Sequence, residues 1–167
     1  MDDQQIQRGK HWLEEMLQLS GLPATVQPDL ERTGAEGSCW LIIDDATLTH
    51  EQTQILIGEE GNVLDAVQYL ANTILNIGRG EDLQTAYTIE LAGYRVQRQI
   101  ELQQLAEAAV QHVRETGEEY EMAALSAAER RQVHTYLKAT YGDLETYSRG
   151  KEPDRRLVVR LAESEIT

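Results

Sequence analysis

The sequence predicts an α+β protein made of two small domains. Segments with helical spacing of apolar residues are interspersed with short stretches in which apolar and polar residues alternate, a pattern typical of strands. The chain has 167 residues, 41% of them hydrophobic, which is enough for one compact domain or two small ones. Residues 1–92 carry 4 Lys+Arg against 16 Asp+Glu, a net −12, whereas residues 93–167 carry 11 against 13, a net −2. We therefore expect a boundary at Gly93, with domains of 1–92 and 93–167.

The first domain is expected to begin with an amphipathic helix over 8–20, which Gly21 ends. Two strands are predicted at 24–30 and 39–43. The stretch 31–37 between them contains two glycines and is interpreted as a hairpin turn.

The remainder of the first domain contains its strongest helix pattern, over 62–76. Before it, Thr49 is expected to cap a short helix that leads to Ile57. The apolar face predicted for the 62–76 helix is marked by Val63, Val67, Leu70 and Ile74 and widened by Leu64, Ala71 and Leu75. A loop over 77–82 and a strand over 85–91 complete this domain.

The second domain is predicted to start with a long helix over 94–116, ended by Gly117. A short strand is expected at 119–122. Ser126 and Glu129 form a capping box for a helix that runs to about Tyr141. Two further strands are predicted, near 144–147 and 157–161.

A Gly-x-x-Gly turn, Gly58 to Gly61, separates the two helices of the first domain. Glycines allow a nucleic-acid backbone to come close, and the next helix N-terminus offers free amides to a phosphate. The two central residues, however, are Glu59 and Glu60. The repulsion between a carboxylate and a phosphate about 4 Å apart costs about 1 kcal/mol in water and about 4 kcal/mol in a site partly shielded from water. The turn is therefore either a phosphate contact or only a connection between two helices.

Arg130 and His134 are four residues apart and share a face of the 126–141 helix, next to the apolar stripe of Val133 and Leu137. We expect both side chains at the border between core and solvent. There, a guanidinium can bind phosphate with two hydrogen bonds and an imidazole can donate or stack. The alternative is a solvated arginine beside a half-buried structural histidine.

The C-terminal segment is basic in an otherwise acidic chain. Strand alternation places Arg156 and Arg160 on one face, which predicts a surface that contacts nucleic-acid backbone without base specificity. The alternative is an edge strand kept soluble by its charges. The candidate binding residues of this segment are Arg149, Lys151, Arg155, Arg156 and Arg160, opposed by Glu152 and Asp154 for a local net of +3.

Three separate stretches carry a resemblance to one bacterial family. They are Ile57-Gly58-Glu59-Glu60-Gly61-Asn62-Val63-Leu64-Asp65-Ala66-Val67-Gln68-Tyr69-Leu70, then Gly93-Tyr94-Arg95 with Glu129-Arg130-Arg131-Gln132-Val133-His134, and Gly150-Lys151-Glu152-Pro153-Asp154-Arg155-Arg156-Leu157-Val158-Val159-Arg160. Together the sequence resembles the Jag (SpoIIIJ-associated) family, also known as KhpB or EloR, over most of residues 55–161.

The resemblance implies a KH-like domain, with helices on a three-stranded sheet, followed by an R-three-H (Arg-x-x-x-His) α/β domain with a long first helix. It also implies binding of single-stranded RNA, with Arg130, His134, the basic segment, Gly58 and Gly61 as candidate contacts, and a regulatory role linked to cell growth or division. The separate N-terminal domain usual in that family is expected to be absent.

Enzymatic chemistry is not expected. No Cys/His cluster has metal spacing, and no P-loop, dinucleotide-binding or nucleophile motif occurs, so neither a metal nor a cofactor is predicted. A single Cys39, an acidic N-terminus and the lack of an apolar run of about 20 residues favour a cytoplasmic protein that does not cross a membrane.

The alternative function is protein interaction. In that case the acidic first domain has lost its affinity for RNA and docks a protein partner, such as a second KH-domain protein, another copy of the chain or a basic ribosomal surface.

Overall fold

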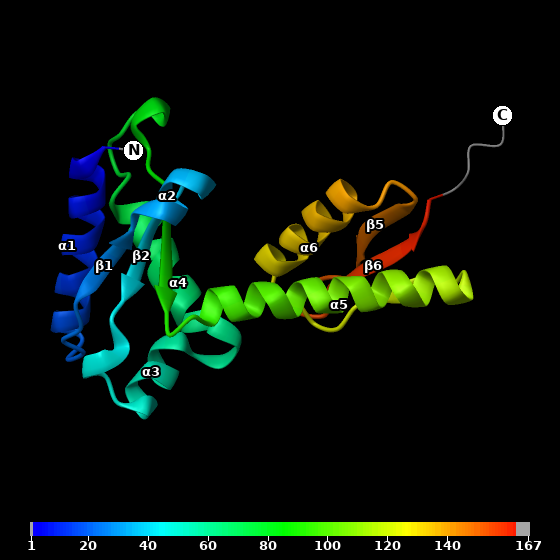
Figure 1. Ribbon diagram of the computed structural model, residues 1–167, viewed down its shortest axis with the longest axis horizontal. Helices are drawn as coiled ribbons and strands as arrows, with labels where there is room; N and C mark the ends of the chain where they lie inside the picture. Colours follow the sequence, from blue (N-terminus) through cyan, green and yellow to red (C-terminus); the bar gives the residue numbers. More distant parts are fainter. Residues whose placement is uncertain (1, 163–167) are drawn as a thin grey trace. The chain divides into compact units, whose positions relative to one another are not determined.

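The computed structural model describes residues 2–162 and confirms a mixed α+β protein (Figure 1). Its contacts divide the chain into two compact units, Met1–Arg95 and Val96–Thr167. The boundary expected at Gly93 lies close to this division. Within residues 2–162, no helix has both the length and the apolar character needed to cross a membrane.

The first unit is a three-stranded sheet covered by helices. The strand order is β1-β2-β3, with β1 (Val26–Asp29) antiparallel to β2 (Cys39–Ile43) and β3 (Tyr87–Leu91) parallel to β2. The helices are α1 (Asp3–Leu19), α2 (Leu30–Glu36), α3 (His50–Ile57) and α4 (Asn62–Ile74).

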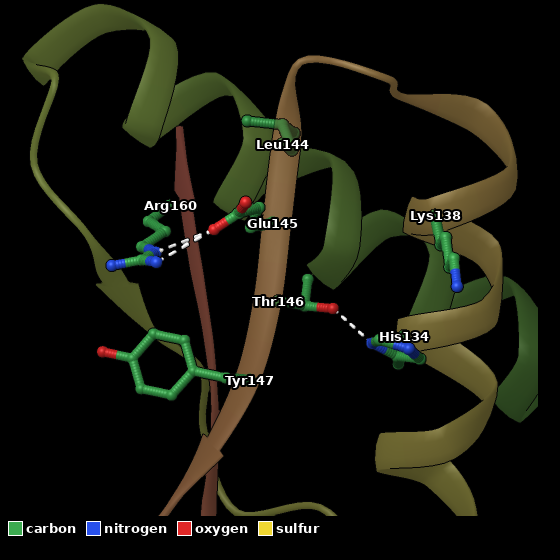
Figure 2. A pocket seen from close by; sticks show the side chains of 7 residues that line it. All are labelled: His134, Lys138, Leu144, Glu145, Thr146, Tyr147 and Arg160. Carbon is green, nitrogen blue, oxygen red and sulfur yellow. Dashed lines mark hydrogen bonds and ion pairs between the residues drawn. The ribbon is translucent and has the colours of Figure 1, made fainter. Parts of the chain in front are cut away.

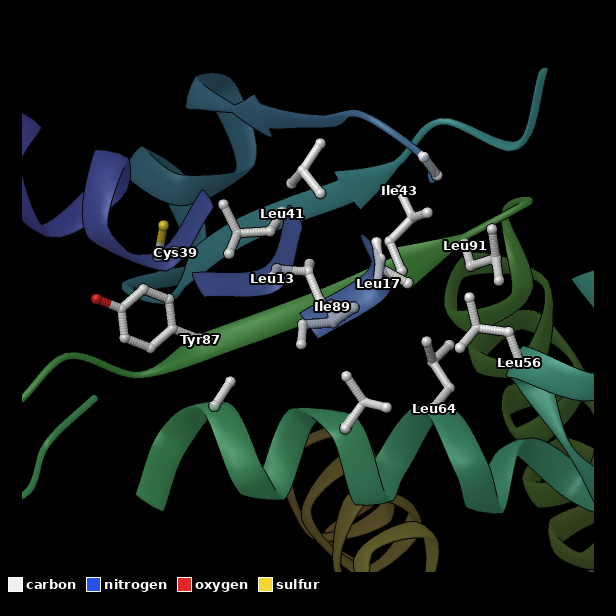
Figure 3. Packing of buried hydrophobic residues seen from close by; sticks show 14 of the residues in the cluster. Leu13, Leu17, Cys39, Leu41, Ile43, Leu56, Leu64, Tyr87, Ile89 and Leu91 are labelled. Atoms are coloured by element: carbon white, nitrogen blue, oxygen red, sulfur yellow. The ribbon is translucent and has the colours of Figure 1, made fainter. Parts of the chain in front are cut away.

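The core of this unit lies between the sheet and helices α1 and α4 (Figure 3). Leu13 and Leu17 of α1 and Leu64 of α4 are fully buried against Leu41 of β2 and Ile89 of β3. Burial of large aliphatic side chains of this kind is the main source of folding free energy.

The stretch 31–37 is a helix, so the hairpin turn predicted there is wrong. Asp29 caps α2 by accepting a hydrogen bond from the amide of Arg32, and Gly37 ends it with a left-handed φ of 68°. The glycine that suggested a turn is a helix C-cap, for which the left-handed region is the usual conformation. The short helix covers Trp40, whose indole Nε1 donates to Glu36 over 3.1 Å.

The buried face of α4 is rotated from the one expected. Its buried residues are Leu64, Val67 and Ala71, with Leu75 just beyond the helix, whereas three residues of the predicted core face are partly exposed: Val63, Leu70 and Ile74. The helix is apolar around much of its circumference, so spacing alone did not identify the side that packs on the sheet.

Polar side chains of α4 and of the turn that follows it determine this rotation. Asn72 and Asn76 each exchange two hydrogen bonds of 2.8 Å with the backbone of Tyr87 and Thr85, respectively, along the outer edge of β3. Gln68 accepts from the amide of Ile89 over 3.0 Å. Since buried backbone groups need partners, these three amides fix the side of α4 that faces β3.

The second unit packs two helices on an antiparallel three-stranded sheet. The helices are α5 (Tyr94–Thr116), whose first two residues belong to the first unit, and α6 (Ala127–Thr140). The strand order is β4-β6-β5, with β4 at Tyr120–Glu121, β5 at Leu144–Arg149 and β6 at Arg156–Leu161. The capping box predicted from Ser126 and Glu129 is present at the start of α6, and so is the one that begins α3 at Thr49.

Candidate nucleic-acid interface

Arg130 lies on the buried stripe of α6, together with Val133 and Leu137. The residue is only 6% exposed, so it is buried and does not lie at the border between core and solvent, where the sequence predicted it. The guanidinium Nη1 donates to the carbonyl oxygen of Leu125 over 2.7 Å and to that of Arg155 over 3.4 Å, and Nη2 donates to Glu152. Arg130 therefore connects the start of α6 to the segment between β5 and β6.

Three other residues of α6 form the stripe that borders solvent beside β5. Arg131, His134 and Lys138 follow one another at intervals of three and four residues, so they share a helix face. His134 is half-buried, as the sequence indicated, while Arg131 and Lys138 are exposed. Neither cation was singled out from the sequence, although their spacing from His134 carried that information.

His134 is fixed by the neighbouring strand. Its Nδ1 shares a hydrogen bond with the Oγ1 of Thr146 on β5 (Figure 2). The contact orients the imidazole and leaves Nε2 outside this bond. Thr146 is thus a third residue, after Arg131 and Lys138, that the sequence did not reveal as part of this region.

Two open hollows meet at this pair. One, of about 580 Å³, is lined by His134, Lys138, Leu144, Glu145, Thr146, Tyr147 and Arg160 (Figure 2). The other, of about 360 Å³, is lined by Ala127, Arg130, Arg131, His134, Thr146, Tyr147, Ser148, Arg155 and Leu157. Because His134, Thr146 and Tyr147 line both, the two hollows adjoin each other, and together we call them the α6–β5 groove.

Most arginines of the basic segment are paired with carboxylates. Arg149 donates to Glu119 and Arg160 donates to Glu145 over 2.9 Å. Arg156 is 3.9 Å from a carboxylate oxygen of Asp154. These pairs reduce the attraction that this face exerts on phosphate.

Four cations near the groove or in the adjoining segment have no such pairing. Within the part of the chain that the structure describes, no hydrogen bond or ion pair holds the side chains of Arg131, Lys138, Lys151 and Arg155. Arg131, Lys138 and Arg155 line the groove, whereas Lys151 lies in the segment between β5 and β6.

Hydrogen bonds from arginines lower the pKa of several carboxyl groups of this unit, among them Glu119 and Glu129. Hydrogen bonds from Arg149 and Tyr147 lower the pKa of Glu119. Burial alone would raise the pKa of Glu129, but hydrogen bonds from Arg98 and from the backbone of Ser126 lower it overall. Both groups are therefore held as carboxylates at neutral pH.

The glycines of the turn at Gly58 and Gly61 are accounted for by packing within the first unit. Both have left-handed φ values, 76° and 80°. A Cβ on Gly61 would lie 2.5 Å from the ring of Tyr94, and one on Gly58 would lie 2.5 Å from a methyl group of Val63. The space that each glycine leaves is filled by a side chain of the protein itself. The structure therefore explains both glycines without a ligand.

Within residues 2–162, no group of three or more His, Cys, Asp or Glu side chains is arranged to hold a metal ion. Cys39 is buried in β2, where loss of hydration raises the pKa of its thiol to about 11.

A family model for the R-three-H domain matches residues 100–161, which contain the α6–β5 groove. The chain is 30% identical to the RNA-binding protein KhpB of Lactiplantibacillus plantarum over 118 residues, which are 70% of this chain and 36% of that protein. It is 29% identical to KhpB of Bacillus subtilis over 113 residues, 67% of this chain and 53% of that one, and 28% identical to KhpB of Clostridium symbiosum over 117 residues, 70% and 51%.

This chain thus spans between about a third and half of the length of these relatives. Each match is longer than the 72 residues of Val96–Thr167, so each also includes part of the first unit.

Proposed function

We propose that this chain, which belongs to the Jag/KhpB family, binds single-stranded RNA by holding its backbone in the α6–β5 groove. The relatives are named as RNA-binding proteins, and the R-three-H match covers both elements that form the groove. Binding of this kind needs no bond-making step, cofactor or metal, so the protein is proposed to be non-enzymatic.

The observation that carries the proposal is the set of three unpaired cations in the groove. Arg131, Lys138 and Arg155 surround the fixed imidazole of His134 in a chain whose net charge is −14. A cation already paired with a carboxylate must give up that partner to bind phosphate, whereas an unpaired cation does not. The groove is therefore the place where a polyanion gains most.

Arg130 acts as a positioning residue in this proposal. Its guanidinium holds the carbonyl of Arg155, so it fixes the backbone from which the Arg155 side chain projects. Ordering that backbone before RNA arrives lowers the entropy lost on binding.

The first unit is proposed to be the KH-like domain, with a turn at Gly58 to Gly61 that contributes little to RNA affinity. The packing of Tyr94 on Gly61 and the carboxylates of Glu59 and Glu60 both support this assignment. We extend the proposal to a cytoplasmic regulator of RNA linked to growth or division, as the family resemblance implies.

A salt titration of the full chain tests the proposed groove. Binding of a short single-stranded oligoribonucleotide is measured by fluorescence anisotropy at several salt concentrations. Replacing Arg131, Lys138 and Arg155 together by Gln should lower the log-log salt slope by about 2, since each neutralised phosphate contributes about 0.7 on a single strand. A control replaces Lys10 and Arg79, in the first unit, by Gln, and the change in slope is compared per positive charge removed.

An unchanged slope in the groove variant, with an intact thermal transition, would contradict the proposal. An equal loss of slope per charge removed in the control would show that binding depends on overall charge and not on the groove.

A second candidate function is self-association through α4. Val63, Leu70 and Ile74 lie on one face of α4 and are partly exposed, and Ile77, just beyond the helix, is 69% exposed. Together they form an exposed apolar surface of the kind that docks another protein. Replacing Leu70 by Lys should then lower the mass measured by analytical ultracentrifugation from dimer to monomer. A wild-type chain that remains monomeric at high concentration would exclude this candidate, leaving a second KH-domain protein as the partner to test by co-purification.

A further inference from the structure

We propose that one base of the bound RNA stacks on Tyr147, on the face of β5 opposite to α6, while the phosphates remain on the α6 side. This inference rests on the proposed function, because it adds a base contact to the same groove. In this arrangement the nucleotide passes over the edge of β5 that faces away from β6, with its phosphate on one side of the strand and its base on the other.

The position of β5 allows this crossing. Within the described residues β5 pairs only with β6, so its other edge has no strand beside it. Thr146 and Tyr147 are adjacent and point to opposite sides of the strand, the first toward His134 and the second away from α6 (Figure 2). Tyr147 nevertheless lines both hollows, so a strand lying in the groove comes within reach of its ring.

The ring of Tyr147 is already held in place. Its Oη donates to Glu119 Oε2 over 2.7 Å and accepts from Arg149 Nη2 over 2.6 Å. The guanidinium carbons of Arg149 and Arg160 both lie 5.6 Å from the ring centroid. The residue remains 36% exposed. A rigid, partly exposed aromatic ring can accept a base without the entropic cost of ordering its side chain.

The charges around Tyr147 favour a base over a phosphate. Arg149 pairs with Glu119 and Glu121, and Arg160 pairs with Glu145, so three carboxylates surround two guanidinium groups. A phosphate brought to this face meets a slight excess of negative charge, whereas an uncharged base meets only the ring and the flat guanidinium groups. The unpaired cations lie on the opposite side of β5, which separates the backbone site from the base site.

This arrangement requires a single strand. A base in a duplex is already stacked and paired, so it reaches Tyr147 only after it is flipped out at a cost of a few kcal/mol. Because every base has an aromatic face, the contact would discriminate strandedness more than sequence.

The test uses the full chain and an oligoribonucleotide that carries a fluorescent adenine analogue whose emission is quenched on stacking. Wild-type protein should quench the analogue at one position when it is moved along the strand. Tyr147→Leu should abolish the quenching and lower affinity about tenfold, within the range for one base–aromatic contact, while leaving the salt slope unchanged. Tyr147→Phe keeps the ring but loses both phenol hydrogen bonds, and it should retain the quenching and nearly all of the affinity.

The outcomes separate this inference from the proposed function. If the groove variant loses salt slope but wild-type protein quenches the analogue at no position, Tyr147 does not stack and the inference is overturned. Loss of affinity in Tyr147→Phe equal to that in Tyr147→Leu would also overturn it, since the hydroxyl and not the ring would then matter. If the groove variant keeps its slope, the proposed function fails first. Should Tyr147→Leu not fold, the wild-type quenching experiment and Tyr147→Phe still decide the question.

Discussion

Two adjacent arginines of α6 are expected to respond in opposite ways to replacement by alanine. Arg130 is buried and holds the backbone, whereas Arg131 is exposed in the α6–β5 groove without a partner among the described residues. Arg130→Ala should therefore lower stability and Arg131→Ala should lower RNA affinity. The pair share residue type and helix, so each is the control for the other.

The magnitude for Arg130 follows from its contacts. Its removal takes away both hydrogen bonds that Nη1 donates, the one of 2.7 Å to the buried Leu125 carbonyl and the longer one of 3.4 Å to the Arg155 carbonyl. An unsatisfied buried polar group costs about 1–3 kcal/mol, so the two together amount to about 3 kcal/mol. The ion pair with Glu152 adds little, because that carboxylate side chain is 57% exposed. For a unit of this size, about 3 kcal/mol corresponds to a lower Tm by about 12–24 °C.

The assay can follow each unit separately. Both tryptophans of the chain, Trp12 and Trp40, lie in the first unit, so their fluorescence reports the unfolding of that unit alone. Circular dichroism reports the helices of both. Arg130→Ala should shift a circular dichroism transition to lower temperature and leave the tryptophan transition in place.

The RNA measurement completes the comparison. Arg131→Ala should keep both thermal transitions and reduce the log-log salt slope by about 0.7, the value for one phosphate on a single strand. At a temperature where Arg130→Ala is folded, its slope should equal that of wild type. A reduced slope in Arg130→Ala, or a lower Tm in Arg131→Ala, would refute the assignment of the two roles.

Three further predictions concern other parts of the chain. Gly61→Ala should destabilise the first unit by about 2–4 kcal/mol in tryptophan-monitored denaturation, because the cost of the left-handed φ and the cost of the clash with the Tyr94 ring add together. Gly78 has a similar φ of 73° but open space around it, so Gly78→Ala should cost only about 1–2 kcal/mol. Equal costs for the two variants would contradict the packing argument. The Cys39 thiol, with a pKa of about 11, should react with a thiol reagent at pH 8 far more slowly in the native protein than in denaturant, and equal rates would be inconsistent with its burial. The folded-state pKa of Glu129 is lowered, so its contribution to stability is present above the unfolded value of about 4.5 and is lost as pH falls through the folded pKa; Glu129→Gln should thus cost about 1 kcal/mol at pH 7 and less at pH 3, by circular dichroism.

Local signals in the sequence were sufficient to predict several boundaries. Thr49 and Ser126 each form the capping box expected of them, because the hydrogen bonds that start a helix involve residues only three apart. The strand at Cys39–Ile43 and the long helix at Tyr94–Thr116 also agree with the expected ranges.

The predictions for α2 and for the buried face of α4 were wrong because the local sequence is compatible with two structures in each case. Glycine ends a helix and also forms a turn, so α2 was mistaken for a hairpin turn. The apolar residues of α4 surround much of the helix, and only contacts with β3, formed through Gln68, Asn72 and Asn76, determine which of them are buried.

In the candidate site, ion pairs between residues far apart in the sequence determine which cations remain available to bind phosphate. Glu119 lies 30 residues from Arg149, and Glu145 lies 15 from Arg160, so no spacing rule relates them. Arg131 was accessible to sequence reasoning, because it precedes His134 by three residues on a helix whose core stripe was correctly identified at Val133 and Leu137.

The side-chain amides that α4 and the turn after it place along β3 have a consequence for assembly. An uncovered edge strand is a template onto which another chain can add by backbone pairing, and it is a common origin of aggregation. On β3 and just before it, the backbone groups of Thr85, Tyr87 and Ile89 are already bonded. Five of these hydrogen bonds are made by the side-chain amides of Gln68, Asn72 and Asn76, and one by Arg95. A second molecule cannot extend the first sheet from this side without breaking those bonds. The amides thus occupy the edge of β3 in place of a further strand, and in this way they protect the sheet from edge-to-edge polymerisation.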